Sequence, residues 1–310
     1  MRWFGKTQKE PGWMAIALDD RGASYVHGVA DGAGGAAIGR FGRTEAGSGA
    51  GEKLARDLQA ERYQCVTLLQ PGQYQMLVVD APNVPQAELK SAIRWRIKDL
   101  LDFHVDDATV DVLDIPAEGG AAARPHSMYA VAARNEVIQA QVRAFEAAHI
   151  PLSVIDVPEV AQRNLSALHE AEGRGAALLY FNDEFGLLTI TRGGELFLAR
   201  RIDIGMRQML EADADARGAL FGRIVLELQR SFDHFDRQFH YVAVSKLVLG
   251  PEPRETGLLE HLGANLDLPV ERADLAGKLA FDAADVPDAA TQWRLFHLIG
   301  ASLRREDKAL

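Results

Sequence analysis

The sequence contains a single cysteine, Cys65, so the chain cannot form an internal disulfide. A chain without disulfides fits a reducing compartment. No uninterrupted apolar run approaches the roughly 20 residues that a helix needs to cross a bilayer. The N-terminal stretch MRWFGKTQKEPGW also lacks the apolar core of a signal peptide. These absences predict a soluble cytoplasmic protein with no transmembrane segment.

Positive charge is also in short supply. The chain has 34 Lys and Arg against 44 Asp and Glu, which gives a formal net charge of -10. Proteins that bind nucleic acid need clustered basic residues to neutralise phosphates, so we expect no nucleic-acid partner and no acidic substrate. At 310 residues, with 47% hydrophobic and 25% charged residues, the chain has an ordinary globular composition and room for two subdomains.

Catalytic signatures are missing as well. No GxSxG, HExxH or CxxC pattern occurs, so hydrolase chemistry has no support and we expect no catalytic residue. The stretch 28–51 is rich in glycine but contains neither GxxxxGK[ST] nor GxGxxG. We therefore interpret residues 28–51 as a flexible surface loop and not as a phosphate-binding loop.

A possible metal site lies on the helix predicted over residues 217–240. Asp236 and His240 are four residues apart and share one helical face, which suits two ligands, and Asp233 and His234 lie nearby. No third ligand of clear identity accompanies them. We interpret this set as the solvated side of a phenylalanine-striped helix and expect no metal.

The stretch 76–116 organises the chain as strand, helix, short link and strand. Pro85 suits the first helical position, and the apolar residues from Leu89 to Leu101 recur at helical spacing over 86–101. Trp95 lies off this stripe, between Ser91 and Asp99. It is either a filler at the edge of the core or a contact for a partner, since aromatic residues are enriched at interfaces.

The remaining periodicity predicts alternating strands and helices. Strands are expected over 13–18, 23–29, 64–69, 127–132, 153–157, 176–181, 185–191, 195–202 and 247–249, and helices over 52–60, 134–149, 159–172, 217–240, 258–266 and 291–305. Short turns separate the strands between 176 and 202, which predicts an antiparallel meander.

This order resembles the actin-like ATPase fold, and the local sequences resemble the PilM-type pilus assembly proteins. Among these they are most similar to the MshI branch, which serves the mannose-sensitive haemagglutinin (MSHA) type IV pilus. The matching residues are 92–100 (AIRWRIKDL), 110–112, 130–134, 227–235 (ELQRSFDHF), 249–250, 257–259 and 300–304.

The resemblance implies a mixed α/β fold, the two-subdomain actin-like ATPase (ribonuclease H-like) fold. It predicts a first subdomain over residues 12–174, with residues 70–150 as a small inserted α+β unit. A second subdomain is predicted over residues 175–290, with the helix 291–305 packing back on the first subdomain.

The resemblance places a nucleotide pocket at Asp20, Gly22, Asn182 and Gly250. Three departures from the family pattern predict that this pocket is degenerate. The turn after the first strand has little hydroxyl character. The Asp183-Glu184 pair would repel phosphates. The stretch 250–254 (GPEPR) contains prolines, which have no N–H to donate. We expect no cofactor, with ATP and magnesium as the alternative.

The resemblance also implies a partner, a PilN-like inner-membrane protein. Its N-terminal cytoplasmic peptide would lie between the inserted unit and its parent subdomain. The groove residues we predict are Arg94, Trp95, Lys98 and Phe103. The cytoplasmic pilus motor ATPase is a second candidate partner. Two functions stay open: a non-catalytic scaffold held at the inner membrane by its partner, or an ATP-binding switch or slow ATPase of the same complex.

Overall fold

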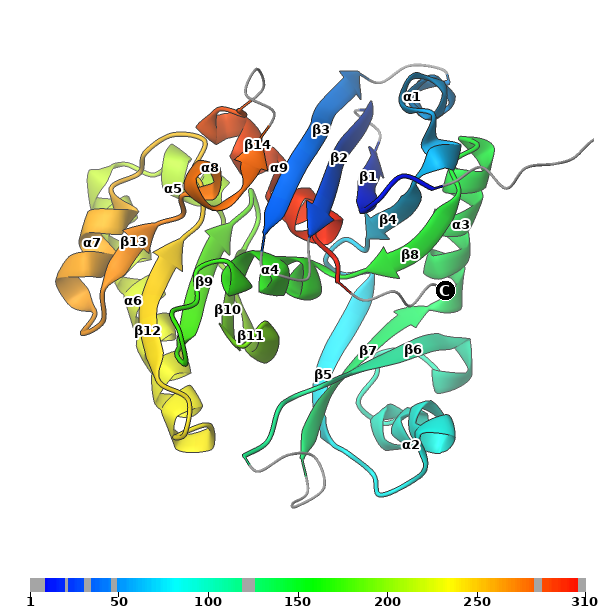
Figure 1. Ribbon diagram of the computed structural model, residues 1–310. Coiled ribbons are helices and arrows are strands. Elements are labelled where there is room, and N and C mark those ends of the chain that lie inside the picture. Colours follow the sequence, from blue (N-terminus) through cyan, green and yellow to red (C-terminus); the bar gives the residue numbers. More distant parts are fainter. Residues whose placement is uncertain are drawn as a thin grey trace, which may run out of the picture. The chain divides into compact units, whose positions relative to one another are not determined.

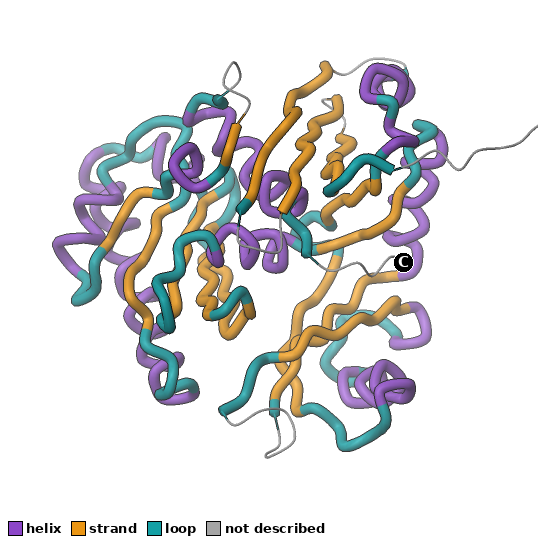
Figure 2. Tube along the Cα trace, in the orientation of Figure 1, coloured by secondary structure: helices purple, strands orange, loops and turns teal. Residues whose placement is uncertain are grey.

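The computed structural model describes residues 9–19, 22–30, 35–45, 49–118, 126–281 and 286–305 (Figures 1 and 2). They fall into two compact units. The first unit contains the described residues of 9–24 and 43–158, and the second contains those of 25–42 and 159–305. Asp20 lies outside the described residues.

The strands are β1 (Trp13–Asp19), β2 (Gly22–Ala30), β3 (Ala36–Glu45), β4 (Gln64–Leu68), β5 (Tyr74–Asp80), β6 (Ala108–Asp114), β7 (Ser127–Arg134), β8 (Leu152–Asp156), β9 (Gly175–Phe181), β10 (Gly186–Arg192), β11 (Glu195–Ile202), β12 (Val244–Leu249), β13 (Val270–Arg272) and β14 (Ala280–Phe281). The helices are α1 (Ala50–Leu58), α2 (Gln86–Ile97), α3 (Asn135–Ala147), α4 (Pro158–Ala167), α5 (Met206–Glu211), α6 (Ala214–Gln238), α7 (Leu258–Asn265), α8 (Leu275–Lys278) and α9 (Ala289–Ser302), with 3-10 turns η1 (Ala60–Arg62) and η2 (Val105–Asp107).

In the first unit, β4 pairs in parallel with both β1 and β8. A separate antiparallel sheet has the order β5-β7-β6, and α2 packs against its outer strands (Figure 1). Leu89, Ile93 and Ile97 of α2 are buried with Val110 and Ala130 of the sheet. The apolar stripe read from the sequence therefore holds α2 on this sheet.

The first unit does not separate cleanly at the end of the predicted insert. Helix α3 contacts β7 of the three-stranded sheet, β8, and also α1. It therefore connects the two parts of the unit. The subdomain bounds 12–174, 70–150, 175–290 and 291–305 stay a prediction.

In the second unit, the sheet order is β11-β10-β9-β12-β13. Strands β9, β10 and β11 form the predicted antiparallel meander, while β12 joins β9 in parallel. The long helix α6 is capped at its N-terminus by Asp213, whose side chain accepts a hydrogen bond from the N–H of Ala216. Phe235 of α6 meets Phe197 of β11 with ring centroids 6.5 Å apart.

Helices α4 and α9 cross closely in the second unit. A Cβ built on Gly300 of α9 would lie 2.7 Å from the carbonyl carbon of Ala161 of α4, so only glycine fits there. The side-chain amide of Asn164 donates to the carbonyl of Gly300 at 2.9 Å. The backbone of one helix therefore rests directly on the other.

A buried glutamine ties α4 to both the sheet and α9. The amide nitrogen of Gln162 donates to the carbonyls of Leu178 and Leu187, and its oxygen lies 3.1 Å from Nε2 of His297. Because that oxygen can only accept, Nε2 of His297 carries the proton. Burial lowers the pKa of His297 to about 3, so the ring is neutral near pH 7.

The interpretation of residues 28–51 as a loop is wrong over 36–45, because these residues form β3. Gly42 fits this strand because a Cβ there would lie 2.8 Å from the hydroxyl of Tyr25, and Gly39 similarly adjoins the ring of His27. Glycine allows these large side chains to lie over the strand. The glycine-rich composition of the stretch suggested flexibility, but these glycines instead allow side chains of β2 to pack closely against β3.

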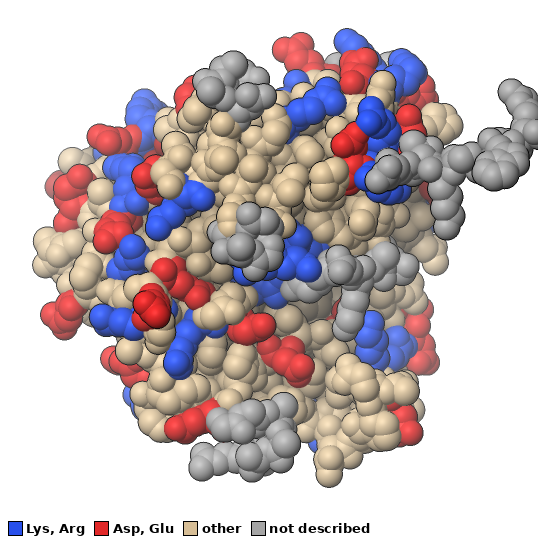
Figure 3. Space-filling model, viewed as in Figure 1, with Lys and Arg blue, Asp and Glu red and all other residues tan. Residues whose placement is uncertain are grey.

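Charged side chains of both signs are interspersed on the face drawn in Figure 3. Across the described part of the chain, no helix combines the length and the apolar character needed to span a bilayer.

We predict that Gly300→Ala lowers the free energy of unfolding by roughly 1–3 kcal/mol, because the added methyl group overlaps the α4 backbone. Gly218→Ala is the matched control, since this exposed position on α6 has nothing within 4 Å of the added Cβ. The control variant should gain about 0.5–1 kcal/mol from its helix propensity. Urea unfolding of both variants measures the difference, and equal effects would contradict the close crossing.

Candidate functional site

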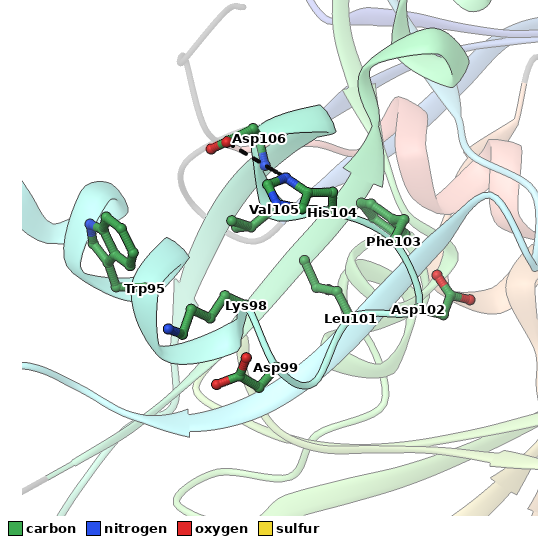
Figure 4. A pocket seen from close by; sticks show the side chains of 9 residues that line it. All are labelled: Trp95, Lys98, Asp99, Leu101, Asp102, Phe103, His104, Val105 and Asp106. Atoms are coloured by element: carbon green, nitrogen blue, oxygen red, sulfur yellow. Dashed lines mark hydrogen bonds and ion pairs between the residues drawn. The ribbon is translucent and has the colours of Figure 1, made fainter.

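A pocket of about 700 Å³ lies in the first unit, at the end of α2. It is lined by Trp95, Lys98, Asp99, Leu101, Asp102, Phe103, His104, Val105 and Asp106, which come from α2, the following link and η2 (Figure 4). Figure 4 shows Trp95 at one end of the pocket and Asp102 and Phe103 at the other. Three of the four predicted partner-binding residues thus line one cavity.

Trp95 is a solvent-facing side chain with 70% of its surface exposed. It follows the fully buried Ile93 by two residues, which is more than half a turn of helix, so it points away from the sheet. The ammonium of Lys98 lies 5.6 Å from the centre of its ring. Of the two roles open from the sequence, the filler of the core edge is excluded.

Arg94 differs from its neighbours because its guanidinium is used inside the unit. Nη1 donates to the carbonyl of Ala108 at 2.5 Å, and Nη2 donates to the carbonyl of Val105 at 2.6 Å. The side chain therefore fixes η2 and the start of β6 against α2. Arg94 supports the wall of the pocket and is not among the residues that line it.

Phe103 forms part of the floor and part of the core. It packs against the buried cluster under α2, and the guanidinium of Arg134 lies 4.5 Å from its ring centre. Arg134 also lies 3.7 Å from the carboxylate of Asp102. The N–H of Asp102 donates to the side chain of Gln75. The far end of the pocket is therefore held by both the sheet and the link.

Acidic residues of the pocket were missed by the sequence interpretation. Asp99, Asp102 and Asp106 line it, against the single cation Lys98. Each of the three carboxylates is exposed. The signal was available in the sequence, because the stretch 99–107 (DLLDFHVDD) concentrates aspartates around Phe103.

The predicted nucleotide residues are distributed over both units. Gly22 starts β2 in the first unit, with a φ of 132° that favours glycine. Asn182 and Gly250 lie in the second unit, each directly after a strand.

The turn at Asn182 already uses its own backbone donors. The side-chain oxygen of Asn182 accepts hydrogen bonds from the N–H groups of Glu184 and Phe185, both at 2.9 Å. The carbonyls of Asn182 and Asp183 accept from Met206 and Arg207 at the start of α5. These N–H groups are therefore engaged within the protein, where a phosphate would need donors.

The segment after β12 is likewise filled by its own side chains. The carboxylate of Glu252 is buried, accepts a hydrogen bond from the hydroxyl of Thr256 at 2.5 Å and pairs with Arg272 at 3.1 Å. Gly250 packs against Tyr180, where a Cβ would lie 3.0 Å from the ring. A buried carboxylate needs such partners, so the contacts of Glu252 hold this segment in place.

Asp233, His234 and Asp236 lie exposed on α6, and His240 is exposed just after it. Among the residues whose positions are described, no three His, Cys, Asp or Glu side chains are grouped closely enough to hold a metal ion.

No model of a known protein family matches the sequence, and no curated protein matches it. A solved structure described as the PilM–PilN type IV pilus biogenesis complex is similar to 94% of this chain and 99% of its own, with a TM-score of 0.72 and 17% identity. The chain has a PilM-like, actin-like ATPase fold. At this identity the likeness shows the fold alone.

Two further solved structures are more distant. The cytoplasmic domain of EpsL, an inner-membrane component of the type II secretion system of Vibrio cholerae, has a TM-score of 0.47 and 11% identity, and covers 94% of this chain and 93% of its own. The ethanolamine utilization protein EutJ from Carboxydothermus hydrogenoformans has a TM-score of 0.44 and 12% identity, and covers 96% and 91%. These likenesses are too loose to carry an argument.

We predict that substitutions of two adjacent residues of α2 differ in their effect on stability. Arg94→Met should lower the free energy of unfolding by roughly 1–3 kcal/mol, because two backbone carbonyls lose a charged donor. Trp95→Ala should change it by less than about 0.5 kcal/mol, because the side chain is exposed. Thermal unfolding of both variants is the measurement. A large loss for Trp95→Ala would mean that the tryptophan is part of the core.

Proposed function

We propose that this chain is a non-catalytic docking scaffold of a type IV pilus assembly machine, in the branch of the PilM-like proteins that serves the MSHA pilus. It binds the N-terminal cytoplasmic peptide of a PilN-like inner-membrane protein, which holds it at the cytoplasmic face of that membrane. The observation that carries the proposal is a PilM-like fold with two predicted phosphate-binding turns, one after β9 and one after β12. In both turns, polar groups are hydrogen-bonded to other groups of the protein itself.

Three features support docking without nucleotide chemistry. The N–H groups of Glu184 and Phe185 are hydrogen-bonded to Asn182, and Glu252 fills the segment after β12. In the first unit, an exposed tryptophan stands beside a pocket with apolar and charged walls. Exposed tryptophans that can be covered by a partner are typical anchors of protein interfaces.

The docking residues in this proposal are Trp95, Lys98 and Phe103, with Arg94 as their support. An extended peptide would cover the tryptophan and place a side chain between it and Phe103. The pilus motor ATPase stays a second predicted partner. An ATP-binding switch or slow ATPase is the alternative function, and the glycine at the first turn, Gly22, is the feature that favours it.

We predict that calorimetric titration with magnesium-ATP detects no binding with a dissociation constant below about 1 mM. The physical reason is that the N–H donors of the Asn182 turn are already hydrogen-bonded within the protein, and that the carboxylate of Glu252 would repel a phosphate. Thermal unfolding with 1 mM magnesium-ATP is an independent readout. A dissociation constant near 1 µM would stabilise the fold by about 4 kcal/mol under these conditions, and would establish the ATP-binding alternative.

We predict that a synthetic peptide covering the arm that precedes the membrane span of the PilN-like protein of the same machine binds the full chain. Trp95→Ala should weaken this binding by about 2 kcal/mol or more, since the ring is the central apolar contact. Leu226→Ala is the control, because Leu226 is an exposed apolar residue on α6, outside the pocket. Fluorescence anisotropy of the labelled peptide measures both. Equal affinities of the peptide for the two variants would mean that the pocket is not the docking site.

A further inference from the structure

We infer that the pocket beside Trp95 selects a basic peptide: Lys or Arg side chains of the docked arm lie against Asp99 and against Asp106, while their apolar neighbours cover Trp95 and Phe103. The inference rests on the proposed function and adds the chemistry of the segment that is recognised. Arg94 and Lys98 alone would favour carboxylates of a partner, so the aspartates of the pocket decide the charge of the arm.

The basic side chains around the pocket are directed to other groups. Arg94 faces the carbonyls of Val105 and Ala108, and Arg134 faces Asp102 and the ring of Phe103. Lys98 is exposed and lies over Trp95. It is the only cation among the residues that line the pocket.

The acidic side chains on the open side are less well neutralised. Asp99 has no ion-pair partner among the residues that the structure describes. Within the described part of the chain, the carboxylate of Asp106 has one candidate ion-pair partner, Nδ1 of His104 at 3.6 Å, and the same Nδ1 accepts a hydrogen bond from the N–H of Asp106. Because Nδ1 accepts this hydrogen bond, it does not at the same time donate to the carboxylate of Asp106.

The pocket therefore presents two exposed carboxylates next to apolar walls. An incoming ammonium or guanidinium gains from whichever carboxylate it approaches, and a long Lys or Arg stem also packs along apolar surface. An acidic arm would meet Asp99 and Asp106 with a single lysine to offset them. Complementary charge of this kind acts mainly on the association rate and on specificity.

The membrane supplies an arm of the matching charge. Cytoplasmic segments near a membrane span carry an excess of Lys and Arg, and the cytoplasmic leaflet is anionic. A chain with a net charge of -10 is repelled by that surface. Docking on a basic arm gives this chain an attractive contact where the lipid itself offers none.

The test is a double-mutant cycle, in which one variant changes the protein and the other changes the peptide. It uses the full chain and the synthetic arm described above. The protein variant is Asp99→Asn with Asp106→Asn, and the matched control is Asp233→Asn with Asp236→Asn, which removes two exposed charges on α6. The peptide variant has each Lys and Arg replaced by Gln. Affinities are measured at low and at physiological ionic strength.

We expect the pocket variant to bind the native arm more weakly, by roughly two- to fivefold per carboxylate, and the control to bind like the wild type. The Gln arm should bind the wild-type chain more weakly than the native arm does, but should lose little further affinity on the pocket variant, because the same contacts are already gone. The loss should shrink at higher salt.

Independent effects of the two changes would overturn the inference, as would equal losses in the pocket and control variants. In either case the arm still binds and the scaffold proposal stands. Absence of binding of the native arm to the wild-type chain at millimolar concentration would instead overturn the proposed function, and this inference with it.

Discussion

The second unit depends on the contact of α9 with α4, which is possible because residue 300 has no side chain. This close approach brings His297 to Gln162 and, further along α9, Trp293 to the end of β9. The indole N–H of Trp293 donates to the carbonyl of Phe181, and the hydroxyl of Tyr180 donates back to the carbonyl of Trp293. The packing of two helices thereby fixes the end of a strand.

The same strand end carries the features that bear on nucleotide binding. Asn182 follows Phe181 directly, and Gly250 packs on the ring of Tyr180. The polar groups here find their partners within the protein itself: the side chain of Asn182 accepts from two N–H groups, and Thr256 and Arg272 satisfy the buried Glu252. A phosphate would have to displace these hydrogen bonds before it could form its own.

Much of this architecture follows from the sequence, because periodicity reports which face of an element is buried. The stripe of α2 placed Trp95 off the core, and its exposure of 70% agrees. The roles of Arg94 and Lys98 could not be separated in this way, since both are long basic residues near one face. What separates them is the path of residues 98–108, which brings two carbonyls to Arg94. Composition likewise failed for β3, where glycine makes room for Tyr25.

The pocket shows how a rigid support and an exposed contact surface can be made from consecutive residues of one helix. Arg94 donates its hydrogen bonds to backbone carbonyls and so supports the wall of the pocket. Trp95 lies on a different face of the helix and contributes nothing to the core. Substituting the tryptophan can therefore change binding without changing the fold, which is the property a docking surface needs. The aspartates after the helix add a charge pattern that apolar packing alone would not supply. In the proposed docking, affinity and specificity would thus be carried by different residues of the same short segment.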